Sequence, residues 1–170
     1  MIRIRPAAPN DAAELPEIER SSGAIFQTVS GLEWIADDDV QSEDRHLELI
    51  LRGFSLVAEQ PGHGIIAFLN GERTSDGLHL WQIAVHQDYQ RQGIGRRLIE
   101  EARRIAAQHG ISSLTLTTFR DVPWNQTYYR RLGFSTLQET SLTPHLRKVL
   151  ADEARAGLPM DCRCAMLMKI

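Results

Sequence analysis

The segment Gln90–Gly95 (Gln-Arg-Gln-Gly-Ile-Gly) has residue types and a spacing that suit the binding of an anion. It follows a strand-like apolar stretch and opens the clearest helical pattern of the chain, residues 95–109. The first N–H groups of a helix have no acceptor within the helix and lie at the positive end of its dipole. Gly93 and Gly95 let a ligand approach the backbone closely, and Arg91 adds positive charge. A phosphate group is therefore the expected ligand.

Other anion-binding motifs fit this segment less well, but the residues alone leave one alternative open. The dinucleotide fingerprint requires a third glycine three residues after Gly95, where this chain has Leu98. The P-loop requires Gly-Lys-Ser or Gly-Lys-Thr, and the chain has Gly-Arg at the corresponding point. A glycine-containing turn that only leads into the helix explains the same residues without any ligand.

The elements that must position this segment can be read from hydrophobic periodicity and turn residues. Strands are expected over residues 2–5, 54–59, 65–70, 78–85, 113–118, 134–137 and 164–170. Helices are expected over residues 12–21, 43–51, 95–109 and 144–156, with a short helix that ends before residue 133. The acidic run 37–39 is expected to begin the second helical region, and Asn70-Gly71 to form a turn. This order predicts an α+β (mixed α/β) fold with helices on both faces of a mixed sheet.

Length and composition describe an ordinary globular protein. The 170 residues fall within the usual size of one domain, so we expect residues 1–170 to form a single domain. The net charge of −3 argues against nucleic acid as the main partner, because phosphate binding needs a basic face. No apolar run reaches the about 18 residues of a membrane span, and the first residues lack the apolar core of a signal peptide.

The two cysteines, Cys162 and Cys164, are separated by one residue. On one strand their side chains would point to opposite faces, so no disulfide between them is expected. No further cysteine or histidine at suitable spacing completes a zinc site, and no metal is expected. We therefore expect a protein of the reducing cytoplasm.

Two segments resemble motifs of the GNAT superfamily of acyl-CoA-dependent N-acetyltransferases. Ile83–Gly95 resembles motif A, which is a strand ending in Val, a loop with Gln/Arg-x-x-Gly-x-Gly/Ala and a helix. About forty residues later, Tyr129–Phe134 (Tyr-Arg-Arg-Leu-Gly-Phe) resembles the end of motif B, Tyr-x-x-x-Gly-Phe. The two motifs follow each other in the family's order. The resemblance implies a GNAT-like acyl-CoA N-acyltransferase fold with a mixed sheet of six to seven strands, and the first 50 residues match it only in layout.

The resemblance also implies acetyl-CoA as the acyl donor. In the family, the pyrophosphate lies on the motif A loop, and the pantetheine arm pairs with the preceding strand as an added strand would. Asn125 lies four residues before Tyr129, closer than the family's Asn, so we keep it as a helix cap or a donor contact. The expected donor-binding residues are Ile83, Ala84, Val85, Gln90, Arg91, Gln92, Gly93, Ile94, Gly95, Arg96, Asn125 and Tyr129.

Two residues are candidates for proton transfer. Tyr129 stands where the family's proton-donating tyrosine lies, and a phenol can protonate the departing thiolate. A packing role on a short amphipathic helix is the alternative for Tyr129. His79 lies on the strand beside the expected acetyl group and could relay the amine proton through water. A solvent-facing strand position explains His79 equally well. Ordered water alone is the alternative for deprotonating the amine.

In the family, acceptor specificity comes mostly from the segment between the first two helices and from the last strands, so the resemblance implies an acceptor pocket there. Its candidate residues are Phe26, Glu33, Trp34, Gln82 and Trp124. Acidic and aromatic side chains together suit a cationic or aromatic amine. The alternatives are a solvated acidic helix start and, for Trp124, a place in the core.

The sequence thus predicts an N-acetyltransferase that passes an acetyl group from acetyl-CoA to the primary amine of a small molecule. Direct attack by the amine and Tyr129 as general acid are the expected mechanism. A protein or peptide acetyltransferase that acts on lysine or N-terminal amines is one alternative. A non-catalytic acyl-CoA-binding sensor is another, and a homodimer is compatible with the resemblance because dimers are common in the family.

Overall fold

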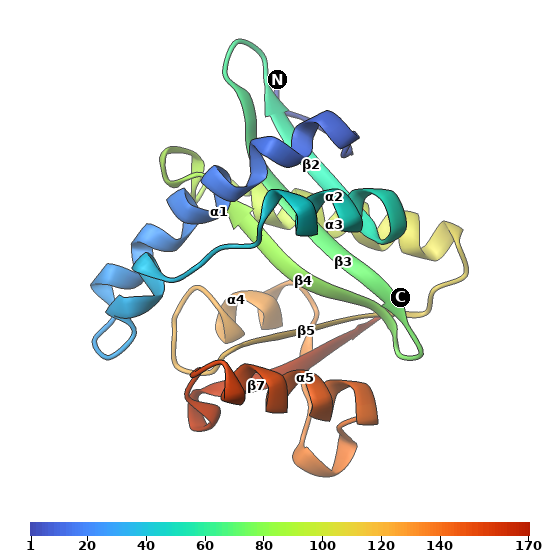
Figure 1. The fold of residues 1–170 in the computed structure, drawn as a ribbon. Helices are drawn as coiled ribbons and strands as arrows, with labels where there is room; N and C mark the ends of the chain where they lie inside the picture. The colour runs from blue at the N-terminus through green and yellow to red at the C-terminus, as the bar shows by residue number, and fades with distance from the viewer. The chain divides into compact units, whose positions relative to one another are not determined.

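The seven strands of the computed structural model, which describes residues 1–170, are hydrogen-bonded in the order β1-β2-β3-β4-β5-β7-β6 (Figure 1). They are β1 (Arg3–Pro6), β2 (Phe54–Gln60), β3 (Gly64–Thr74), β4 (Gly77–Val85), β5 (Ser113–Phe119), β6 (Ser135–Thr136) and β7 (Arg163–Lys169). The α-helices are α1 (Leu15–Gly23), α2 (Glu43–Arg52), α3 (Ile94–Gln108), α4 (Gln126–Arg131) and α5 (Pro144–Arg155). Short 3₁₀ helices are η1 (Pro9–Ala13), η2 (Ala24–Thr28), η3 (Glu33–Asp37), η4 (Gln87–Tyr89), η5 (Glu139–Ser141) and η6 (Met160–Cys162). The expected mixed α+β fold is confirmed.

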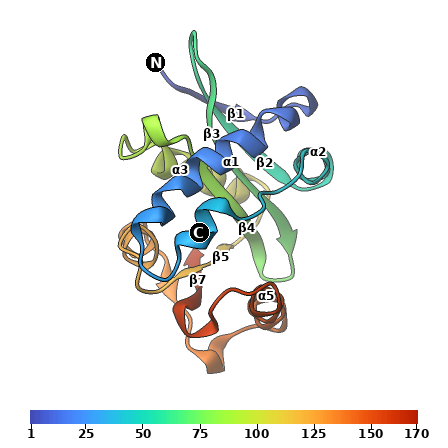
Figure 2. The same ribbon diagram turned by 60° about the vertical axis from the view of Figure 1, so that its left-hand side comes forward.

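Two compact units make up the chain. The first contains residues 1–72 and 81–104, and the second contains residues 73–80 and 105–170. In the first unit, β1, β2 and β3 pair as an antiparallel meander. The helices α1 and α2 cover one face of this meander, and α3 lies on the other face (Figures 1 and 2). Helices on both faces are therefore present within this unit.

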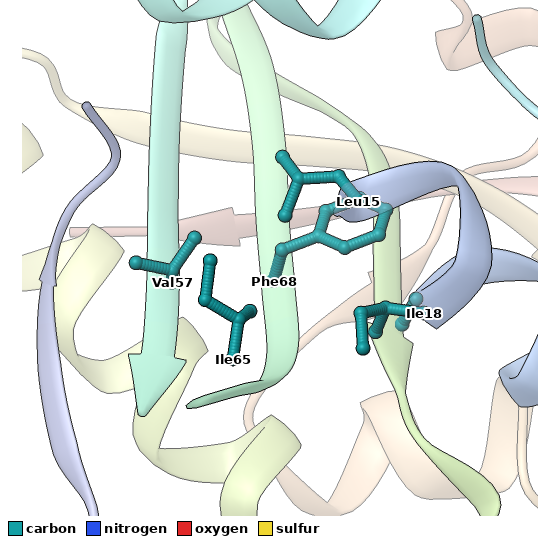
Figure 3. Close-up of a cluster of buried hydrophobic side chains, with 6 residues drawn as sticks. Leu15, Ile18, Val57, Ile65 and Phe68 are labelled. Carbon is teal, nitrogen blue, oxygen red and sulfur yellow. The ribbon is translucent and has the colours of Figure 1, made fainter. Parts of the chain in front are cut away.

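A cluster of apolar side chains joins α1 to the strands of the first unit. Leu15 and Ile18 are one turn apart on α1, so both point from the same side of the helix. They pack against Val57 of β2 and against Ile65 and Phe68 of β3, as Figure 3 shows. All five side chains are buried, and three of them are wholly inaccessible to solvent. This burial fixes α1 across the strands that lead to β4.

The predicted turn at Asn70-Gly71 is wrong, because β3 continues through both residues to Thr74. Asn70 is fully buried, and its side-chain N–H group donates to the Gln41 side-chain oxygen at 2.7 Å. This bond offsets the cost of burying the amide in a strand. A Cβ on Gly53 would lie 2.7 Å from the Gly71 carbonyl oxygen, so the chain passes very close to β3 at this point.

The acidic run Asp37–Asp39 does not begin the second α-helix. Asp37 ends η3, and α2 begins only at Glu43, directly after Ser42. The Ser42 hydroxyl accepts a hydrogen bond from the Arg45 N–H at 3.1 Å, which is the usual way for serine to cap a helix. All three aspartates are exposed, and Asp38 and Asp39 lie in the connection before this cap.

In the second unit, β5 and β7 pair antiparallel along their full length, and β6 lies beyond β7. The first residues of β4 run parallel to β5, so that His79 lies opposite Thr115. The helix α5 packs against β7 and begins after Thr143, whose hydroxyl accepts from the Leu146 N–H at 3.2 Å. Cys162 of η6 and Cys164 of β7 are both free thiols.

Candidate functional site

The segment Gln90–Gly95 forms the predicted transition from strand through loop to helix. β4 ends at Val85, η4 forms a single turn, and α3 begins at Ile94. Two residues of the loop have left-handed backbone conformations, Arg91 with φ of 61° and Gly93 with φ of 77°. The Arg97 N–H donates to the Gly93 carbonyl at 3.1 Å and is the first bond of the helical ladder. The amides that precede Arg97 therefore have no acceptor within α3 and lie at its positive end.

The side chain of Gln90 braces the loop from within. Its amide group donates to the Val85 carbonyl at 3.0 Å and lies 3.4 Å from the Ser22 carbonyl. The residue is half-buried, and Ile94, which starts the helix, is almost wholly buried. Gln90 thus holds the loop in shape through protein contacts, while the exposed backbone of Gly93 is the part open to an anion.

Two serines at the end of α1 contact the backbone at the end of β4. The Ser22 hydroxyl accepts from the Val85 N–H at 3.3 Å, and the Ser21 hydroxyl accepts from the Gln87 N–H at 3.1 Å. Neither serine is among the residues predicted from the sequence. They lie more than sixty residues before their partners and have no local pattern that marks them, so only the fold reveals them.

The arginines around the loop differ in how they are used. Arg96 forms an exposed ion pair with Glu100 at 2.7 Å, and Arg97 donates to the Ile2 carbonyl at 2.9 Å. An exposed pair of this kind contributes little stability and rearranges easily. Arg91 is exposed on the loop itself. Loop amides together with Arg91 therefore provide the positive potential that a pyrophosphate requires.

The predicted donor residues before the loop have distinct places on β4. Ala84 is fully buried and belongs to the core cluster of the first unit, whereas Ile83 is half-buried. The Val85 N–H is held by Ser22, as described above. Gln82, a predicted acceptor-site residue, is half-buried on the same strand.

Tyr129 lies on α4 in the second unit and is partly buried between aromatic rings. Its ring meets Phe134 edge-on at 5.8 Å and Tyr128 at 5.3 Å between centroids. Burial raises the pKa of the Tyr129 phenol well above its ordinary value, Tyr128 raises it further, and Arg163 lowers it slightly. The phenol is therefore protonated throughout the neutral range, which is the form that a proton donor requires.

His79 is not a solvent-facing strand residue. Only 1% of its surface is exposed, its Nδ1 atom lies 2.9 Å from the Thr115 hydroxyl, and its ring meets His145 edge-on at 5.0 Å. Burial, and then the neighbouring His145, lowers the pKa of His79 to about 4, with a small opposing effect of Asp76. Such an imidazole is a weak base, and its contacts with β5 and α5 fit a packing role better than proton relay.

The other predicted residues are spread over both units. Asn125 stands at the start of α4, but its side chain makes no capping hydrogen bond, and Trp124 beside it is half-buried. In the first unit, Phe26 is half-buried on η2, and Glu33 and Trp34 are exposed on η3. Trp34 is 40% exposed, which is unusual for a residue of this size.

The second unit contains a cavity of about 400 Å³ that sequence reasoning did not predict. Leu150 of α5, Met160 of η6 and Cys164 of β7 form part of its apolar lining. Arg120 and Arg163 contribute charged groups to its lining. The Arg163 guanidinium is bound by Glu153 at 2.9 Å and lies over the Phe119 ring, so it fixes the cavity wall.

Comparison with protein families identifies the class of protein. Residues 24–134 match the model of the acetyltransferase (GNAT) family, and this stretch contains both the loop before α3 and the Tyr129–Phe134 segment. The match covers well over half of the chain, so the chain belongs to the GNAT acetyltransferase family. Members of this family are acyltransferases that use acetyl-CoA as donor, and this chain is therefore an acetyltransferase with that donor. None of its helices is long and apolar enough to cross a membrane.

Solved structures share the whole fold at low sequence identity. The PaiA N-acetyltransferase from Thermoplasma acidophilum, in complex with coenzyme A, is 20% identical, with a TM-score of 0.72 over 100% of this chain and 99% of its own. The ribosomal-protein-S18-alanine N-acetyltransferase from Escherichia coli is 21% identical, with a TM-score of 0.71 over 100% and 94%. N-acetylglutamate synthase from Neisseria gonorrhoeae, complexed with coenzyme A and N-acetyl-glutamate, is 19% identical, with a TM-score of 0.73 over 99% of this chain and 35% of its own.

Proposed function

We propose that this acetyltransferase transfers the acetyl group of acetyl-CoA to the primary amine of a small molecule, with Tyr129 as the general acid. The observation that carries the donor half is the loop before α3. Its left-handed Arg91 and Gly93 present the first amides of α3 at an exposed surface. The pyrophosphate of the donor is the anion that this surface fits.

The proposed reaction is direct attack of the neutral amine on the thioester carbonyl. The amine must first lose its proton, because an alkylamine has a pKa of about 10.4 and is mostly protonated at neutral pH. A water molecule takes this proton in the proposed scheme, since His79 is buried and has a pKa of about 4. The N–H of Ile83 or Ala84 is proposed to stabilise the oxyanion, and Tyr129 gives its phenolic proton to the departing thiolate. The attacking nitrogen loses its second proton as the amide forms, and this proton restores the Tyr129 phenol through water.

Tyr129 carries its phenolic proton at neutral pH, as an acid must, although burial raises its pKa and so weakens it as a donor. What supports its role as acid is its position in the Tyr129–Phe134 segment, and ring contacts with Tyr128 and Phe134 hold the phenol in one orientation. Removing only the hydroxyl tests this role while leaving those contacts in place. We expect Tyr129→Phe to lower kcat by about 10²–10⁴-fold, since that is the usual contribution of general acid catalysis.

The measurement is steady-state thiol release from acetyl-CoA at saturating amine, together with the Kd for acetyl-CoA. An unchanged Kd with a large loss of kcat supports the acid role. A loss of kcat smaller than about threefold refutes it. Tyr128→Phe is the matched control, because it removes the same group from the neighbouring ring and is expected to keep kcat within about threefold.

A protein or peptide amine is the second candidate acceptor. One specific observation favours it. The Escherichia coli protein whose structure shares the fold over 100% of this chain is a ribosomal-protein-S18-alanine N-acetyltransferase. The N-acetylglutamate synthase with the same fold is complexed instead with N-acetyl-glutamate, an acetylated small amino acid. The fold alone serves both kinds of acceptor. We propose the small amine as the first candidate acceptor. We also propose a cytoplasmic setting, because both cysteines are free thiols.

A further inference from the structure

Three hydrogen-bonding contacts link the end of α1, the end of β4 and the loop before α3. The Ser22 hydroxyl accepts from the Val85 N–H at 3.3 Å. The Gln90 side-chain amide donates to the Val85 carbonyl at 3.0 Å and lies 3.4 Å from the Ser22 carbonyl. Both backbone groups of Val85 are thus engaged, one by a side chain of α1 and the other by a side chain of the loop.

The Val85 N–H lies on the strand edge opposite to β3. The next residue, His86, donates its N–H to the Ile66 carbonyl of β3 at 2.9 Å. Successive N–H groups of an extended strand point to opposite edges, so the Val85 N–H points away from β3. An extended ligand that adds to β4 as a further strand must pair along this same edge.

We propose that Ser22 is a gate residue that competes with the pantetheine arm of acetyl-CoA for the Val85 N–H. The inference rests on the proposed function and on a pantetheine arm that lies along β4, as the resemblance to the family implies. Only one acceptor can take the Val85 N–H in good geometry, so a pantetheine carbonyl displaces the Ser22 hydroxyl when the arm binds. The hydroxyl otherwise satisfies a partly buried N–H that would lack a protein partner.

The displacement requires only a local movement. A serine hydroxyl changes partner by rotating about one side-chain bond between staggered positions. The Ser22 carbonyl stays bound to Gln90, so the backbone of α1 keeps its place during this rotation. Ser22 therefore lowers the affinity for the pantetheine arm without blocking it, and its removal tightens binding.

Ser21 provides a matched comparison within the same turn of α1. Its hydroxyl accepts from the Gln87 N–H at 3.1 Å, a bond of the same kind and similar length. Gln87 lies in η4, beyond the strand along which the arm pairs. Loss of the Ser21 hydroxyl removes support from the loop but frees no donor for pantetheine.

The test is isothermal titration calorimetry with two probes on the full chain. Coenzyme A carries the pantetheine arm, and adenosine 3′-phosphate 5′-diphosphate has the same nucleotide without it. We expect Ser22→Ala to bind coenzyme A about two- to fivefold more tightly, because a neutral hydrogen bond of this length no longer competes. The affinity for the nucleotide is expected to stay unchanged, Ser22→Thr to retain wild-type affinities, and Ser21→Ala not to tighten coenzyme A.

The two probes separate failure of the gate from failure of the proposed function. Equal coenzyme A affinities of wild type and Ser22→Ala would overturn the gate, and so would tightening of the nucleotide or tightening by Ser21→Ala. If the wild type bound neither probe, the donor site itself would be refuted and the gate with it. The Val85 amide resonance in nitrogen-15 spectra gives a second readout. Without coenzyme A, this resonance should differ between Ser22→Ala and the wild type. With coenzyme A bound, the two resonances should coincide.

Discussion

Gly93 has a left-handed backbone with φ of +77°, and nothing lies within 4 Å of the place where a Cβ would stand. The substitution Gly93→Ala therefore adds a methyl group to the exposed face of the loop without a clash inside the protein. Gly62, in the turn between β2 and β3, has φ of +81° and equally open surroundings. Gly62→Ala is thus a control with the same backbone cost at a site away from α3.

The cost in stability should be the same for both variants. An L-residue in the left-handed region costs roughly 1–2 kcal/mol, and the reduced entropy of the unfolded chain returns about 0.4–1 kcal/mol. We expect each variant to lose about 1 kcal/mol, which corresponds to a fall in Tm of about 2–4 °C in a protein of this size. Urea unfolding measures this loss directly.

The effect on donor binding should separate the two variants. A methyl group on Gly93 keeps the pyrophosphate from the loop amides, and each lost charge-assisted hydrogen bond is worth about 1.5–3 kcal/mol. We expect Gly93→Ala to bind coenzyme A roughly ten- to hundredfold more weakly, and Gly62→Ala to bind it as the wild type does. A Kd for Gly93→Ala within threefold of that for Gly62→Ala would refute the assignment of this loop.

Two further predictions concern stability. His79 titrates at about pH 6.5 when unfolded but has a pKa of about 4 when folded, so stability is complete above pH 6.5 and falls by up to about 3 kcal/mol as the pH drops to 4. His79→Gln should flatten urea-unfolding stability between pH 7 and 4, and an unchanged slope would contradict the burial effect. Gly77→Ala should lower Tm by at least about 6 °C, because its Cβ would overlap the Ser113 carbonyl at a φ of +123°. A loss no larger than that of Gly62→Ala would contradict this.

Local features of the fold follow well from the sequence. The strand ends at Val85, as the apolar pattern predicts, and the helix starts at Ile94, one residue before the predicted start. Gly110 ends α3 with φ of +70°, as expected for the residue just past a helix. Such features depend on neighbouring residues, and a single sequence contains that information. The expectation that residues 1–170 form one domain stays a prediction.

Features that depend on distant residues could not be predicted. Asn70-Gly71 has the composition of a turn. The burial of Asn70 depends on Gln41, which lies 29 positions earlier and is brought to it only by the fold. His79 was expected at a solvent-facing or catalytic position, and its burial depends on the packing of α5. Ser21 and Ser22 are brought to Gln87 and Val85 by the tertiary structure alone. The same limit applies to the acceptor, since no local motif specifies it.

The proposed reaction is acetyl transfer to a small primary amine. The most direct measurement is thiol release from acetyl-CoA across a panel of small cationic, aromatic and amino-acid amines and of peptides with free N-termini or lysines, with mass spectrometry of each product. We expect thiol release with at least one small amine and a product heavier by one acetyl group, and a rate about ten- to hundredfold lower in Gly93→Ala at low acetyl-CoA. Binding of acetyl-CoA without release for any amine, or release with peptides only, would contradict it.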